Sequence, residues 1–297
     1  MERKKFGQLM NYQRLKNMIE LAITFILIFV ALLFEGVRRK IIARMQNRVG
    51  PPLLQPFYDL LKLLTKKGVH EQNLIFSLVP SITLATSLVI LLFVSALFVS
   101  QSFLGFDYNF LLIGYLFILQ DTFLIFGAVS SRSPFAVHSS MREMLIMLGY
   151  ELAFLILLSL FFIKASVFNF VSYPLDLAIL QLPLASILLF YVGYVILKIT
   201  PYDVVNADAE ISGGFLTEYY GKDLAILELA EFIKNFCFYI IFAFLVFGKS
   251  YFLPASLGIL VLYELMRATT PRYSTFRAAK TFALILLLAF VDLFLVI

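Results

Sequence analysis

The sequence predicts an all-α, polytopic membrane protein that forms a single transmembrane domain over residues 1–297. Hydrophobic residues make up 61% of the chain and charged residues only 14%, and the mean hydropathy is +0.93. Soluble globular domains carry far more charge. Several apolar runs also reach the roughly 20 residues that a helix needs to cross a bilayer. Helices are expected because the hydrocarbon core forces the backbone to satisfy its polar groups internally.

We expect eight spanning helices, each at an apolar run. They cover about residues 18–35, 74–99, 110–130, 143–163, 180–199, 224–247, 252–267 and 279–297. The first run, Leu21–Phe34, is followed by Arg38-Arg39-Lys40 without a small-residue cleavage site, so it is an anchor and not a signal peptide. The second run has no charged residue, whereas the third, fourth, sixth, seventh and eighth contain acids. Pro271 stops the seventh helix.

A further amphipathic helix is expected over about residues 52–66. Gly50-Pro51-Pro52 breaks the chain, and proline suits the first turn of a new helix. Beyond it, polar residues recur at helical spacing on an otherwise apolar segment, namely Gln55, Asp59, Lys62 and Lys66. This pattern is typical of a helix lying on the lipid surface with its lysines in water. It also fits a lateral helix that packs on the bundle and frames an inner cavity.

The charge distribution predicts the orientation. Most of the 24 lysines and arginines fall in the connections after the first, third, fifth and seventh helices. The positive-inside rule places these connections in the cytoplasm and both termini outside, with the protein spanning the plasma membrane. Soluble partners are therefore expected on the cytoplasmic face.

The residues that usually hold redox centres are scarce. Cys237 is the only cysteine and lies in an apolar run, and the two histidines, His70 and His138, are far apart. No disulfide, iron–sulfur cluster, haem or metal site is expected in this chain. Phosphate-binding and nucleophile motifs are also absent. The redox centres are expected in partner subunits.

An acidic segment stands out from this apolar chain. Between Pro201 and Phe232 there are seven carboxylates and one cation, Lys222; the acids are Asp203, Asp208, Glu210, Glu218, Asp223, Glu228 and Glu231. We expect an acidic cytoplasmic loop over about residues 201–223 that leads into the sixth helix. Ionisable residues at membrane depth are costly and usually mark ion or proton pathways.

Further acids lie within the expected helices. Glu143 and Glu151 would be about 12 Å apart along the fourth helix. Glu151 is interpreted as an inward-facing functional carboxylate, whereas Glu143 is either a second one or an N-terminal charge favoured by the helix dipole. Asp121 lies in the third helix, Glu264 in the seventh, and Asp292 near the C-terminus, where another subunit could cover it.

Two local arrangements leave alternatives open. Glu231 and Lys234 share one face of the sixth helix with Glu228, and either form an internal ion pair or belong to a proton relay. The basic residues are either topology signals or a docking surface for an acidic soluble subunit. The candidate docking residues, with one acid among them, are Arg39, Lys40, Arg44, Arg48, Asp59, Lys62, Arg142, Arg267 and Arg272.

Four motifs, in order and spacing, resemble one membrane-subunit family of complex I, the family of its H subunit, also called subunit 1. They are RKIIARMQNRVGPP with QPFYDLLKLLTKK, REMLIMLGYEL, PYDVVNADAEISGGFLTEYYGKDLAILELAEF and RATTPRY, within about residues 18–280. The resemblance implies an eight-helix subunit that connects a soluble redox arm to an ion-translocating membrane arm. It also implies that carboxylates begin the proton path, at Glu151, Asp203, Asp208, Glu210, Glu218, Glu228 and Glu231.

At some motif positions the sequence differs from the quinone-reducing members of this family. Those enzymes usually read Glu-Arg-Lys where this chain has Arg38-Arg39-Lys40, Asn in place of Pro52, and a small residue in place of Glu143. The chain looks more like the corresponding subunit of energy-converting membrane-bound [NiFe] hydrogenases, formate hydrogenlyase and archaeal sulfane reductase complexes. In these, the electron acceptor is a proton or a sulfur compound.

The expected function is therefore that of a membrane anchor and coupling subunit without a cofactor of its own. The resemblance implies a hydrogenase-like large subunit and an iron–sulfur subunit on the cytoplasmic face, holding iron–sulfur clusters and, in a hydrogenase, a NiFe centre. Antiporter-like membrane subunits would move protons or sodium ions, and no nucleic acid is involved. Two alternatives are a quinone-site subunit and a stand-alone proton-coupled transporter; the large basic face disfavours the second.

Overall fold

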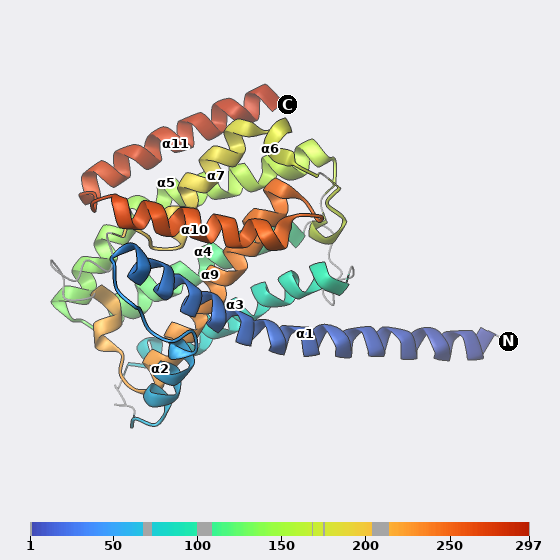
Figure 1. Cartoon of the computed structure of the whole chain (residues 1–297), viewed down its shortest axis with the longest axis horizontal. Helices are drawn as coiled ribbons and strands as arrows, with labels where there is room; N and C mark the ends of the chain where they lie inside the picture. The colour runs from blue at the N-terminus through green and yellow to red at the C-terminus, as the bar shows by residue number, and fades with distance from the viewer. Residues whose placement is uncertain are drawn as a thin grey trace.

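A computed structural model describes residues 2–67, 73–99, 109–167, 169–174, 176–203 and 214–296. Its regular structure in these ranges is helical (Figure 1). The helices are α1 (Glu2–Met45), α2 (Gln55–Leu64), α3 (Leu74–Val99), α4 (Asn109–Ser130), α5 (Pro134–Ala165), α6 (Ala178–Gln181), α7 (Pro183–Ile196), α9 (Lys222–Phe247), α10 (Phe252–Thr269) and α11 (Thr275–Val296). Two 3₁₀ turns are η1 (Phe170–Ser172) and η2 (Gly214–Glu218).

The fold is that of a polytopic membrane protein. In the described part of the chain, seven helices are long and apolar enough to cross a bilayer: α1, α3, α4, α5, α9, α10 and α11. Their outer faces carry exposed apolar side chains such as Phe25, Leu148 and Phe294, as expected of surfaces in contact with lipid. In Figure 1 the C-terminus lies at the top of the view, and the N-terminal part of α1 extends to the right beyond the other helices.

The helix predicted over 180–199 is divided into two. Pro183, which cannot donate a backbone hydrogen bond, begins α7 after the single turn of α6. With 14 residues, α7 rises about 21 Å, less than the roughly 30 Å of a bilayer core. The first turn of α7 has backbone N–H groups without a partner inside the helix. Asp292 of α11 satisfies one of them, because its carboxylate accepts a hydrogen bond from the backbone N–H of Ala185. Asp292 is thus covered by this chain itself.

The end of α1 and the start of α5 differ from the predicted ones, and both differences change the position of charged residues. α1 does not end near residue 35 but continues to Met45, so Arg38, Arg39, Lys40 and Arg44 lie on a helix and not in a connection. Glu35 stabilises the extension by pairing with arginines one turn ahead. α5 begins at Pro134, so Glu143 is inside the helix and is not an N-terminal charge. The N-terminal interpretation of Glu143 is therefore wrong.

The core centres on α9, which packs against α1, α3 and α10. Its residues from Ile233 to Val246 are almost all buried. Aromatic rings fix α7 against α9 and α10: the rings of Phe190 and Tyr263 stack with centroids 4.5 Å apart. Tyr263 also donates a hydrogen bond of 2.7 Å to the carbonyl of Phe190. This contact requires a small residue at position 193, directly facing the tyrosine.

We expect Gly193→Ala to destabilise the protein by about 1–3 kcal/mol, because a Cβ there would overlap the hydroxyl of Tyr263 and approach the ring of Phe238 within 2.7 Å. Gly258→Ala is the matched control, since its Cβ would meet nothing within 4 Å. The control should be neutral or stabilising by up to about 1 kcal/mol. Thermal unfolding of the detergent-solubilised protein measures both, and equal effects would contradict the packing described.

Candidate functional site

A cluster of charged residues lies buried at the middle of the bundle. We call it the inner cluster: Asp121 of α4, Glu143 and Glu151 of α5, Lys234 of α9, and Lys198, which follows α7. Lys234 Nζ donates to Asp121 Oδ1 at 2.6 Å, and Lys198 Nζ lies 3.7 Å from the same oxygen. All three side chains are at most 7% exposed. One carboxylate therefore serves two lysines.

The charge of Lys198 is maintained by acids around it. Burial alone would lower the pKa of this lysine, yet attraction by Asp121, with smaller contributions from Glu231, Glu143 and Asp203, raises it above its ordinary value. The surrounding acids therefore favour the charged form of Lys198.

The two acids of α5 occupy different surroundings. Glu143 Oε1 accepts a hydrogen bond of 2.9 Å from the hydroxyl of Tyr150, and both side chains are buried. Glu151 is 9% exposed, and its Oε1 is buried without a hydrogen-bond partner among the described residues. A buried carboxyl group without a fixed partner is free to bind or release a proton with little rearrangement, as a relay requires.

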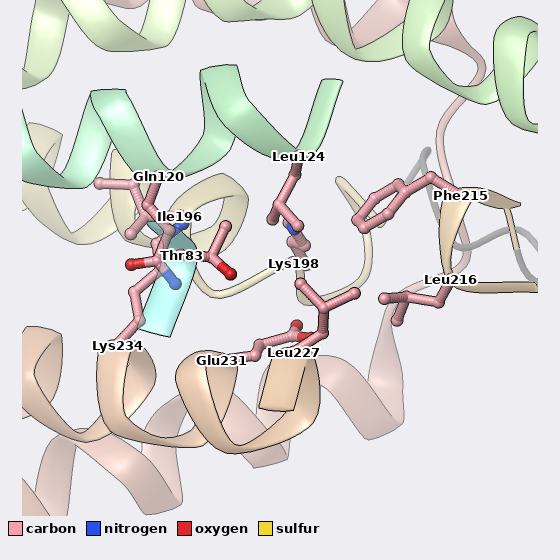
Figure 2. A pocket seen from close by; sticks show the side chains of 10 residues that line it. All are labelled: Thr83, Gln120, Leu124, Ile196, Lys198, Phe215, Leu216, Leu227, Glu231 and Lys234. Atoms are coloured by element: carbon pink, nitrogen blue, oxygen red, sulfur yellow. The ribbon is translucent and has the colours of Figure 1, made fainter. Parts of the chain in front are cut away.

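A small cavity adjoins the inner cluster between α4 and α9. Figure 2 shows Gln120 extending from α4 towards Lys234 and Glu231 on α9, with Thr83 and Lys198 between the helices. Its volume is about 10 Å³, room for about one water molecule. Gln120 donates to the carbonyl of Ala230 at 3.4 Å, while its Oε1 is buried without a partner in the described part of the chain.

A larger polar cavity of about 210 Å³ lies on the other side of Lys198 and Glu231, which line both spaces. We call it the polar cavity. Charged side chains dominate its wall: Arg38, Lys198, Asp203, Glu231, Arg267 and Arg272. It lies at the end of the bundle where α1, α7 and α10 finish, which we call the charged end. Asp203 Oδ2 accepts from Arg272 Nη2 at 3.3 Å, which holds the segment after α7 beside α10.

A second charged network joins α1 to α2. Arg38 and Arg39 both pair with Glu35, at 2.5 and 3.0 Å. Arg39 also donates to Asp59 of α2 at 2.7 Å, and Gln55 holds the other oxygen of Asp59 at 2.8 Å. Buried Leu60 anchors α2 on Leu32, Ala225 and Phe232. The packing of α2 on the bundle agrees with the second interpretation of this helix, and its exposed Phe57 and Leu61 agree with contact with lipid, as in the first.

Buried Glu264 extends this network into α10. It is fully buried, and its Oε1 lies 3.9 Å from Arg38 Nη1. Arg38 thus contacts acids of two helices and also lines the polar cavity. Glu35, the closer of the two acids, lies three residues before Arg38 on the same helix face.

The structure brings several of the predicted relay acids together. Asp121, Glu143 and Glu151 are in the inner cluster, and Asp203 and Glu231 line the polar cavity. Glu228 is half-buried on α9, facing Arg39 and the acids beside it, and Glu218 ends η2 away from the inner cluster. Asp208 and Glu210 lie outside the described residues, as does His70.

Sequence reasoning missed the partners of these acids. Of the two alternatives for Glu231 and Lys234, the ion pair within α9 does not form, because Lys234 Nζ donates to Asp121 on α4. Lys198, Tyr150 and Glu35 also belong to the charged networks. Of these, only Glu35 gave a local signal, since its spacing to Arg38 and Arg39 is that of neighbours on a helix surface.

The predicted docking residues divide into two groups. Arg39, Asp59 and Arg272 are engaged in ion pairs within the chain. The others lie on or near the charged end with exposed or half-exposed side chains: Lys40, Arg44, Arg48, Lys62, Arg142 and Arg267. A basic hollow of about 440 Å³ runs between Arg48, Gly50 and Arg267.

Within the described ranges, no group of three or more histidine, cysteine, aspartate or glutamate side chains is placed to hold a metal ion. Cys237 is fully buried among apolar residues of α9.

Comparisons with known proteins identify the family to which the chain is similar. The chain is 29% identical over 263 residues to the H subunit of the NADH-quinone oxidoreductase of Helicobacter acinonychis, and the match covers 76% of this chain and 77% of the relative. It is 30% identical over 237 residues to NADH-ubiquinone oxidoreductase chain 1 of Mycosarcoma maydis, covering 73% and 70%.

A solved structure shares the fold. A chain of the membrane-bound sulfane sulfur reductase, an archaeal respiratory membrane complex, superimposes with a TM-score of 0.85 at 23% identity, covering 95% of this chain and 99% of that one. The model of the NADH dehydrogenase family matches residues 18–297. The expected resemblance is confirmed, and the chain belongs to the NADH dehydrogenase family, in which its relatives are the H subunits of NADH-quinone oxidoreductases.

Proposed function

We propose that this chain is the membrane anchor and coupling subunit of a complex I-related oxidoreductase of the hydrogenase or sulfane reductase type. It links electron transfer in a soluble redox arm to movement of protons or sodium ions through the membrane arm. The observation that carries the proposal is the inner cluster, whose acids and lysines are buried at mid-bundle and adjoin the polar cavity. Anchoring alone does not require ionised groups at that depth.

The relay runs from the charged end inwards. Asp203 and Glu231 beside the polar cavity form its entrance, Asp121 its centre, and Glu143 and Glu151 its continuation along α5. Glu218 and Glu228 are proposed to belong to the entrance side, and Asp208 and Glu210, outside the described residues, stay candidate relay acids. A change of charge in the redox arm shifts the proton occupancy of these coupled sites together.

The charged end faces the cytoplasm in this proposal, and both termini lie outside. The excess of basic residues at this end supports the orientation. A hydrogenase-like large subunit and an iron–sulfur subunit dock there and hold the iron–sulfur clusters and, in a hydrogenase, the NiFe centre. Antiporter-like subunits lie beside the bundle in the membrane. The basic hollow at Arg48 and Arg267 fits an acidic surface of a soluble partner.

The alternatives have less support. A quinone carries an apolar tail, whereas the polar cavity is walled mainly by charged side chains. A stand-alone transporter is disfavoured because the solved protein that shares the fold is part of a respiratory membrane complex. The electron acceptor is therefore proposed to be a proton or a sulfur compound.

We expect Glu151→Gln to reduce the ions moved per electron by about tenfold or more in the reconstituted complex, because glutamine cannot carry a proton. Electron transfer, measured with the detergent-solubilised complex, should persist. Asp292→Asn is the matched control: this buried acid is outside the relay, and the amide oxygen still accepts from Ala185. Undiminished ion movement in Glu151→Gln would overturn the relay as described.

We expect the double variant Arg44→Glu, Arg48→Glu to weaken attachment of the soluble subunits by about 1.4 kcal/mol or more, or about tenfold in affinity, because both side chains are exposed on the proposed docking face. Co-purification and its salt dependence measure the effect. Lys164→Glu, an exposed reversal at the opposite end of α5, should leave attachment unchanged. If the unaltered complex, the double variant and Lys164→Glu all retained the soluble subunits equally, docking at this face would be excluded.

A further inference from the structure

Lys198 holds an unusual backbone position. It follows α7 with φ of 50°, in the left-handed region where glycine is normally found. Its N–H bonds to the carbonyl of Val195, and the N–H of Ile199 to that of Tyr194, which completes a Schellman-type helix end. A side chain other than glycine is strained here by about 1–2 kcal/mol. Strain retained at a buried charged residue points to a role for the side chain.

The side chain of Lys198 lies between two spaces. It lines the small cavity that adjoins the inner cluster and also the polar cavity that adjoins Asp203 and Arg272. Figure 2 shows it between Leu124 of α4 and Glu231 of α9. The ring of Phe215 covers the ammonium group, with Nζ 4.7 Å from the ring centroid. Lys198 and Glu231 are the two side chains that line both spaces.

The ion pairs of Lys198 are looser than those of its neighbour. Lys234 makes a direct hydrogen bond of 2.6 Å to Asp121, whereas Lys198 stands 3.7 Å away from the same oxygen. Acids attract Lys198 from both sides, Asp121 and Glu143 from the inner cluster and Glu231 and Asp203 from the polar cavity. If the ammonium group of Lys198 moves away from Asp121, Lys234 still pairs with Asp121. The movement therefore leaves no buried carboxylate without a cation.

We propose that Lys198 is a gate between the inner cluster and the polar cavity, its ammonium group exchanging between Asp121 on one side and Glu231 and Asp203 on the other. When Lys198 lies towards Asp121, it compensates the inner cluster and blocks the passage. When it lies towards the polar cavity, the inner cluster becomes more negative and takes up a proton from the opened side. This inference rests on the proposed relay and names the residue that controls entry to it.

The test uses Lys198→Gly in the whole purified complex. Glycine suits the left-handed position and relieves its strain, so folding is retained while the cation is lost. Lys198→Arg keeps the charge. Arg132→Gly is the matched control, because it removes an exposed cation from another left-handed position, φ 58°, away from both cavities.

The first readout is independent of ion movement. A water-soluble carbodiimide labels accessible carboxyl groups, and peptide mass spectrometry measures labelling of Asp121 and Glu143. Lys198→Gly should raise this labelling severalfold, while Lys198→Arg and Arg132→Gly leave it as in the unaltered complex. Equal labelling in Lys198→Gly and the unaltered complex overturns the gate.

The second readout is the number of ions moved per electron in proteoliposomes. Lys198→Gly should lower this ratio by about tenfold with electron transfer retained, because the passage stays open in both directions. If Lys198→Gly moves as many ions per electron as the unaltered complex, the gate is overturned. If the unaltered complex moves no ions, the proposed function fails, and the labelling result alone then decides whether Lys198 closes the passage.

Discussion

The bundle depends on compensation of buried charge at Asp121. Two charges 4 Å apart attract by about 4 kcal/mol at an effective dielectric constant of 20, but removal of each from water costs several kcal/mol. The pair of Asp121 with Lys234 is therefore close to neutral as a stabilising interaction. Its larger consequence is constraint, because loss of either partner would leave an unpaired charge at membrane depth. The pair fixes α4 against α9, the two helices that face each other across the small cavity.

The short helix α7 positions Lys198, the second lysine beside Asp121. α7 ends at Ile196, and the turn that follows it delivers Lys198 beside Asp121. The fold accommodates this by stacking Phe190 on Tyr263 and by placing Asp292 at the start of α7. Irregular backbone at this depth is tolerated where it borders a polar space shielded from lipid.

Sequence patterns predicted the spanning helices well because hydrophobic run length reports directly on bilayer crossing. They predicted less well where polar residues continue a helix. Arg38 and Arg39 looked like the start of a connection, yet Glu35 neutralises them and lets α1 run on. Likewise, the local spacing of Glu231 and Lys234 suggested a pair within one helix. The actual partner, Asp121, is 113 residues away, and helical periodicity contains no information about contacts of that range. The acids were found because an isolated carboxylate in an apolar run is conspicuous, whereas Lys198 at the end of a run resembled an ordinary flanking charge.

In the proposed function, Arg38 is the residue through which an event at the docking face reaches the membrane interior. This arginine pairs with Glu35, approaches Glu264, and lines the polar cavity whose far wall is formed by Lys198 and Glu231. Through Glu35 it is also connected to Arg39 and hence to Asp59 on α2. A partner that pulls on α2, or adds negative charge beside α1, therefore changes the field that acts on Arg38. Because the cavity wall is charged on both sides, a shift of Arg38 alters the balance of attraction on Lys198 without any long-range movement of helices. Coupling by this route needs only side-chain rearrangements, which is consistent with a rigid, aromatic-packed core around α9.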